Sequence, residues 1–136
     1  MSERTQANIA LVLDGWLQPV QRRDFEALGR HVHPDVFWQG LRPEYRCDGR
    51  DEVLAFFARG EDPATAVDRV ELLAGDDHVV VSVRSPGLET VGEVRVDGQV
   101  HLVFTLRDGL IVRIEDYAAR ADALRAAGID ELADWR

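Results

Sequence analysis

The sequence predicts an α+β fold in which three N-terminal helices pack on a curved antiparallel sheet and leave a cone whose open end is a pocket. Apolar residues recur at helical spacings in the first part of the chain, whereas from Ala66 onward they form short runs separated by turn residues, as in strands. The chain has 136 residues, 46% of them hydrophobic, which is enough for one core. We therefore expect a single domain over residues 1–136.

Two helices are expected before the first strand. The first carries one apolar stripe, and Pro19 should end or kink it. The second spans residues 24–32, with Asp24 as its N-cap, and His33-Pro34 breaks it. The stripe of the first helix comprises Ile9, Val12, Leu13, Trp16, Leu17 and Val20.

The third helix is expected after a short strand and an irregular stretch. The run Val36–Trp38 reads as the strand, and residues 40–49 form the stretch. Asp48 is the predicted N-cap of the helix and Gly60 its C-cap. Its apolar side consists of Val53, Leu54, Phe56 and Phe57.

Five apolar runs follow and predict an antiparallel meander. The pairs Asp97-Gly98 and Asp108-Gly109 lie between runs and are strong hairpin signals. A weak helix over residues 121–127, with Gly128 at the C-cap position, follows the last run. The predicted strands are Val67–Leu73, His78–Arg84, Thr90–Val96, Gln99–Leu106 and Leu110–Tyr117.

Composition excludes several classes of function. With 16 basic and 25 acidic side chains the net charge is -9, so a nucleic-acid partner is not expected. All the basic residues are arginine, which excludes Schiff-base and P-loop lysines. No apolar stretch approaches the roughly 18 residues of a membrane span, so no membrane partner is expected. Polar residues follow Met1 and Cys47 has no second cysteine to pair with, which favours a cytoplasmic protein.

The four histidines show no metal-site pattern. There is no His-x-x-x-His pair and no carboxylate cluster of metal-ligand spacing, so we expect neither a metal nor a cofactor. His101 lies on the strand face opposite Leu102 and Phe104, and we interpret it as structural if that face is the dimer side.

Three segments in order resemble the SnoaL-like branch of the NTF2-like superfamily. The resemblance implies a cone-shaped α+β barrel, a homodimer packed through the sheet, and an apolar cavity for small molecules. The superfamily includes polyketide cyclases, ketosteroid isomerases, epoxide hydrolases and dehydratases, so the fold does not fix the function. The segments run from His33 to Gly40, from Cys47 to Val53 and from Arg107 to Tyr117.

The catalytic positions of the known enzymes are replaced in this chain. Placed on the ketosteroid isomerase pattern, the required tyrosine falls on Trp16, the base on Gly40 and the late-strand acid at or beside Leu102. The second aspartate of the limonene-type epoxide hydrolases falls on Ala119. Gln39 stands where many relatives carry histidine, and an amide cannot move protons at neutral pH.

The last strand holds the remaining acid/base candidates. Strict alternation places Ile111, Arg113, Glu115 and Tyr117 on one face, and Leu110, Val112, Ile114 and Asp116 on the other. If the first face lines the cavity, Arg113 and Glu115 can pair and Tyr117 can donate to a ligand. If the second does, Asp116 is a buried general base with a raised pKa. In a third interpretation, the charged residues of this strand form a cross-strand salt bridge on the protein surface.

Two functions are favoured over a third, a protein-interaction module, for which no residues mark a partner site. The first is a small-molecule-binding protein with an apolar, aromatic-lined pocket for a ring-containing ligand. The alternative is an acid/base enzyme, such as a cyclase, isomerase or dehydratase, with Asp116 or Glu115 as base and Tyr117 or Trp16 orienting the substrate. The ligand-binding candidates are Trp16, Trp38, Gln39, Tyr45, Phe57, Leu102 and Phe104.

Overall fold

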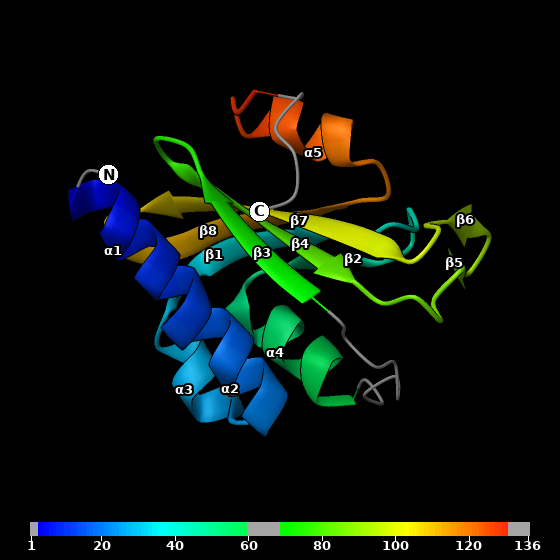
Figure 1. Ribbon diagram of the computed structural model, residues 1–136. Coiled ribbons are helices and arrows are strands. Elements are labelled where there is room, and N and C mark those ends of the chain that lie inside the picture. Colours follow the sequence, from blue (N-terminus) through cyan, green and yellow to red (C-terminus); the bar gives the residue numbers. More distant parts are fainter. Residues whose placement is uncertain (1–2, 60–68, 131–136) are drawn as a thin grey trace.

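The computed structural model describes residues 3–59 and 69–130 and consists of one large sheet with helices on both faces (Figure 1). Helices α1 to α4 lie on one face, which we call the inner face, and α5 lies on the other, the outer face. The N-terminal helices thus share one face, as predicted, and α5, whose side the sequence did not indicate, covers the other.

The first helix is interrupted but does not end at Pro19. It consists of α1 (Glu3–Val12), a π-helical turn η1 (Leu13–Leu17) and α2 (Gln18–Arg22). The Gln18 N–H donates to the Leu13 carbonyl, five residues back, as in a π turn. Pro19 lies in the first turn of α2, where the missing N–H of proline is best tolerated.

The second helix, α3 (Phe25–Gly29), is shorter than predicted. Its cap is confirmed, because the Ala27 N–H donates to Asp24 Oδ1 at 3.1 Å. Val32 begins strand β1 (Val32–Gln39) instead of ending the helix. Pro34 is tolerated within β1 because the pairing of β1 with the neighbouring strand β8 shifts register between Val32 and Phe37. Within this irregular segment, proline does not interrupt a regular ladder of hydrogen bonds.

Strand β2 (Arg46–Asp48) and helix α4 (Arg50–Arg59) follow the irregular loop. The Val53 N–H donates to the Gly49 carbonyl, so Gly49 is the N-cap residue and the predicted cap, Asp48, lies one residue before it. Gly49 has φ of +96°, a conformation that suits glycine. The predicted cap Gly60 lies outside the described residues.

Among the described residues, six strands form the main sheet in the order β2-β1-β8-β7-β4-β3. The predicted antiparallel meander is confirmed for the last four of these strands. However, β1 pairs with β8 in parallel, so the sheet is mixed, and β2 and β3 form two edges instead of closing a barrel. The meander strands are β3 (Arg69–Ala74), β4 (His78–Arg84), β7 (Gln99–Arg107) and β8 (Leu110–Tyr117).

The predicted strand Thr90–Val96 forms a separate hairpin, which extends beyond the end of the main sheet (Figure 1). Its strands are β5 (Thr90–Val91) and β6 (Val94–Arg95), and Gly92 occupies the turn with φ of +59°. A glycine inside an apolar run allows such a tight reversal, which explains why one predicted strand became two.

The sheet separates two hydrophobic clusters. The larger lies between the inner face and helices α1 to α4. The smaller joins Val80 and Val103 of the outer face to Ala123 and Leu124 of α5 (Arg120–Ala126). The predicted helix at residues 121–127 is confirmed, and Gly128 follows it with φ of +70°.

Candidate functional site

A bulge in β8 decides which side chains of that strand face the inner core. The β7–β8 register shifts between Thr105 and Leu106, so Ile111 and Ile114 are both fully buried in the inner cluster. The predicted alternation is therefore wrong at Ile111. Asp116 lies opposite Leu102 and shares the inner face with Ile114.

Six aromatic side chains gather on the inner face. The Trp16 ring lies 5.3 Å from that of Phe57 and 5.6 Å from that of Phe104, both edge to face. The Trp38 ring lies 4.7 Å from Phe56 and 5.3 Å from Phe57. We call this set the aromatic cluster: Trp16, Trp38, Tyr45, Phe56, Phe57 and Phe104. It brings together most of the predicted ligand-binding residues, and Phe56 joins them although its spacing indicated plain core.

The Asp116 carboxyl contacts this cluster through Trp38. The Trp38 indole Nε1–H donates to Asp116 Oδ1 at 3.3 Å, and it is the one hydrogen-bond donor to that carboxyl among the described residues. Burial raises the pKa of Asp116 to about 7, although the indole hydrogen bond lowers it. A carboxyl with this pKa can take up and release a proton at neutral pH, which an ordinary surface aspartate cannot do.

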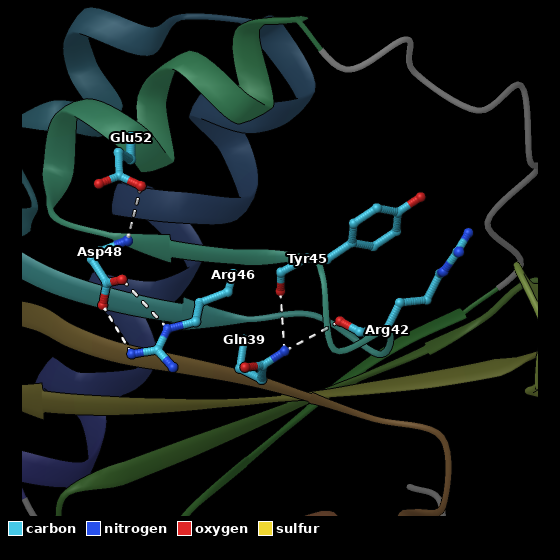
Figure 2. A network of polar contacts seen from close by, with 6 residues as sticks. All are labelled: Gln39, Arg42, Tyr45, Arg46, Asp48 and Glu52. Carbon is cyan, nitrogen blue, oxygen red and sulfur yellow. Dashed lines mark hydrogen bonds and ion pairs between the residues drawn. The ribbon is translucent and has the colours of Figure 1, made fainter.

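Gln39 lies elsewhere and holds a loop. Its partner in β8 is Glu115, on the outer face. Its amide Nε2 donates to the carbonyls of Arg42 and Tyr45 at 3.2 Å each (Figure 2). The Gly40 carbonyl lies 3.3 Å from the same nitrogen. Gln39 therefore positions the loop that carries Tyr45, whose ring lies 5.9 Å from that of Phe56.

The predicted residues Glu115 and Tyr117 lie on the outer face, away from Asp116. Glu115 pairs with Arg113 at 3.0 Å, and the Arg113 guanidinium lies over the Phe37 ring at 4.7 Å. Tyr117 packs against the α5 cluster, and burial raises the pKa of its hydroxyl. The structure thus separates the three predicted catalytic residues into one inner and two outer side chains.

A buried polar row crosses the outer face beneath α5. Glu71, Ser82 and His101 are direct partners on β3, β4 and β7, and each is at most 6% exposed. Ser82 Oγ and His101 Nδ1 are 2.7 Å apart, and Arg120 of α5 contacts Ser82 Oγ at 3.2 Å and Glu71 Oε1 at 2.8 Å. Burial and the Arg120 charge lower the pKa of His101 to about 4, so it is neutral at pH 7. Strand alternation in the sequence predicted that His101 lies on this face, but no sequence pattern indicated its contacts with Ser82 and, through it, Arg120.

Other site classes find little support in the described residues. Within residues 3–59 and 69–130, no three His, Cys, Asp or Glu side chains gather in a way that could hold a metal ion. In the same ranges, no helix is long and apolar enough to cross a membrane. Cys47 is 4% exposed, and burial raises the pKa of its thiol, which keeps it in the protonated, weakly reactive form.

The family model for the SnoaL-like domain matches residues 13–114. This chain belongs to the SnoaL-like family. The predicted resemblance is thereby confirmed. A solved structure of an NTF2-like protein from Burkholderia xenovorans, 15% identical, shares the fold with a TM-score of 0.62, and the match covers 85% of each chain. Among curated proteins, the comparison finds no match.

Several solved structures share the fold. A protein proposed to be a ketosteroid isomerase, from Kribbella flavida, is 25% identical with a TM-score of 0.61, and the match covers 82% of this chain and 77% of that one. A proposed polyketide cyclase from Xanthomonas campestris is 20% identical with a TM-score of 0.64, covering 92% and 98%. An epoxide hydrolase of the LEH-like type from M. tuberculosis is 21% identical with a TM-score of 0.61, covering 90% of each chain.

Proposed function

We propose that this SnoaL-like protein binds a small, ring-containing, largely apolar molecule beside the aromatic cluster, and that Asp116 transfers a proton to and from it. The proposal is based on one observation: a carboxyl with a pKa of about 7 lies on the inner face against Trp38. The likeness to proteins proposed as isomerases and cyclases is consistent with proton transfer at carbon.

The chemistry needs a single carboxylate. Ionised Asp116 removes a proton from a carbon next to a carbonyl, and the electron pair of the C–H bond moves onto the carbonyl oxygen to give an enolate. The protonated carboxyl then returns the proton to the same or a conjugated carbon. Because Asp116 is the one carboxyl that we place against the aromatic cluster among the described residues, the substrate should itself delocalise the enolate charge, as a conjugated cyclic ketone does.

Hydrogen exchange in D2O tests the proposal directly. Conjugated cyclic ketones are incubated with the protein, and loss of the proton on the carbon next to the carbonyl or conjugated with it is followed by 1H NMR. We expect catalysed exchange with the unaltered protein, and a loss of about 100-fold or more with Asp116→Asn. Glu115→Gln is the matched control, since Glu115 lies on the outer face, and it should exchange at the original rate. Equal rates for the protein and its Asp116→Asn variant would overturn the proposal.

A binding protein without turnover is the second candidate. It is favoured by the position of Glu115 and Tyr117 on the outer face, which leaves Asp116 without a second acid or base from its own strand. If this candidate holds, cyclic ketones bind equally to the protein and to Asp116→Asn, and neither catalyses exchange. Ligand-observed NMR on both proteins separates the two functions.

A second copy of the chain is the partner we propose. Helix α5 contacts chiefly β7, β8 and β4, and thus leaves the outer face of β1 and β2 to other contacts. Phe37 lies there, between the guanidinium groups of Arg46 and Arg113 at 4.9 and 4.7 Å. Sedimentation of the protein and of Phe37→Glu tests this: a dimer that dissociates in the variant supports the proposal, and a monomeric unaltered protein rejects it.

A further inference from the structure

The Trp38 side chain is held on all sides. Its strand β1 lies between β2 and β8, with Trp38 paired to Cys47 on one side and to Ile114 on the other. The ring packs on Phe56 and Phe57, and the residue is 4% exposed. An indole so enclosed has little surface for a ligand, but the direction of its N–H bond is fixed.

The fixed N–H bond distinguishes the two oxygens of Asp116. Oδ1 accepts the indole hydrogen bond at 3.3 Å. In the described part of the chain, no other hydrogen bond reaches the Asp116 carboxyl. A carboxylate oxygen that already accepts a hydrogen bond is less basic than its neighbour, and the bond also fixes the plane of the group.

We propose that Trp38 is a positioning residue that holds Asp116 through Oδ1 and leaves Oδ2 as the oxygen that takes the proton. This inference rests on the proposed function, because it assigns the reactive atom of the same site. It also changes the predicted role of Trp38 from ligand contact to support of the base. The indole favours the ionised carboxylate, so it opposes the effect of burial on the pKa.

Removal of the indole N–H tests the inference. The titration of Asp116 is followed from about pH 2.5 to about pH 10 through the 13C signal of labelled aspartate carboxyls, assigned with Asp116→Asn. We expect a midpoint near 7 in the unaltered protein. Trp38→Phe should move it upward by about one pH unit, and the pH profile of any exchange activity should move with it. A purely structural role of Trp38 would lower stability without moving the midpoint.

Two further variants keep the test decisive. If Trp38→Phe does not fold, benzothienylalanine at position 38 keeps the shape of the ring and replaces the N–H by sulfur. Val53→Ala is the control, because Val53 is a fully buried residue of α4 in the same core: it should lose stability and keep the midpoint.

The outcomes separate the two proposals. A raised midpoint that moves further upward without the indole N–H supports both. A raised midpoint that stays in place refutes the role of Trp38 and leaves the proposed function standing. A midpoint near the ordinary 3.8 in the unaltered protein refutes the proposed function itself.

Discussion

At the scale of single residues, the Gln39 amide holds the loop that follows strand β1. The sequence favoured Gln39 as a ligand contact, whereas its amide reaches three backbone carbonyls of the loop that it precedes. Gly40 next to it allows close packing, because a Cβ there would lie 2.8 Å from the Tyr45 Cβ and 2.9 Å from the Trp38 ring. The Gln39 amide and the missing side chain of Gly40 thus allow the loop that carries Tyr45 to pack against the aromatic cluster.

Replacement of Gln39 by alanine should weaken this loop. We expect a loss of about 1 kcal/mol in the free energy of unfolding, since the loop loses its side-chain donor while the Arg42 and Tyr45 carbonyls keep the backbone N–H groups of Tyr45 and Gly40. Gln39→Glu should cost at least as much, because it keeps the size but turns an acceptor toward three acceptors. Urea denaturation measures both. Full stability of Gln39→Glu would contradict the anchoring role.

At the scale of elements, α5 is attached to the sheet by apolar contacts and by the Arg120 ion pair. The Arg120 side chain is 15% exposed and that of Glu71 is 4% exposed, so this pair is far more buried than the Arg125–Asp122 pair of the same helix. Breaking a buried pair leaves a charge with poor solvation, whereas an exposed pair contributes little.

Arg120→Met should therefore destabilise the protein by about 2 to 3 kcal/mol. Addition of Glu71→Leu should recover much of that loss, because the buried charge is then removed as well. Arg125→Met, in the exposed pair, should change the free energy of unfolding by less than about 0.5 kcal/mol. Urea denaturation of the four proteins compares them, and a double variant no more stable than Arg120→Met would argue against this account.

The elements that the sequence predicted well are those with local signals. The Asp-Gly turns predicted the β7–β8 hairpin, and Asp24 predicted the start of α3, because turn and cap chemistry depends on neighbouring residues. The parallel pairing of β1 with β8 and the bulge near Thr105 depend on contacts far apart in the sequence. That bulge placed Ile111 with Ile114, a result that strict alternation could not give.

The candidate site was predictable in its members but not in its arrangement. Asp116, Trp38 and Phe57 were all candidates, because large aromatics and a strand-borne acid are unusual enough to notice. Which face of β8 met the helices was open, and it decided that Asp116 meets the cluster while Glu115 does not. Burial, which raises the pKa of Asp116, exists only after the chain has folded.

At the scale of the whole molecule, the sheet divides two chemical environments. The inner face holds the aromatic cluster and one carboxyl of raised pKa, and the outer face holds the polar row under α5 with a histidine of lowered pKa. Folding shifts the pKa values of the two groups in opposite directions. Asp116 has a folded pKa of about 7 against 3.8, and His101 a folded pKa of about 4 against 6.5.

Because of these pKa shifts, Asp116 and His101 make the free energy of unfolding depend on pH with opposite slopes. The folded state holds the Asp116 proton more tightly, so the stabilisation from Asp116 is present below about pH 4 and is lost as the pH rises to about 7. The unfolded state binds the His101 proton more tightly, so the stabilisation from His101 is complete above about pH 6.5 and is lost as the pH falls toward 4. Between these limits the two effects oppose each other.

Asp116→Asn should expose the contribution of His101. Because asparagine carries no charge to bury, the variant should be more stable than the unaltered protein at pH 8, by about 1 to 3 kcal/mol, and the difference should shrink toward pH 4. Its stability should also rise more steeply between about pH 4 and 6.5. Urea denaturation at several pH values measures both effects. A variant less stable than the unaltered protein at pH 8 would show that the ionised Asp116 carboxylate is well solvated, and the proton-transfer role would lose its physical basis.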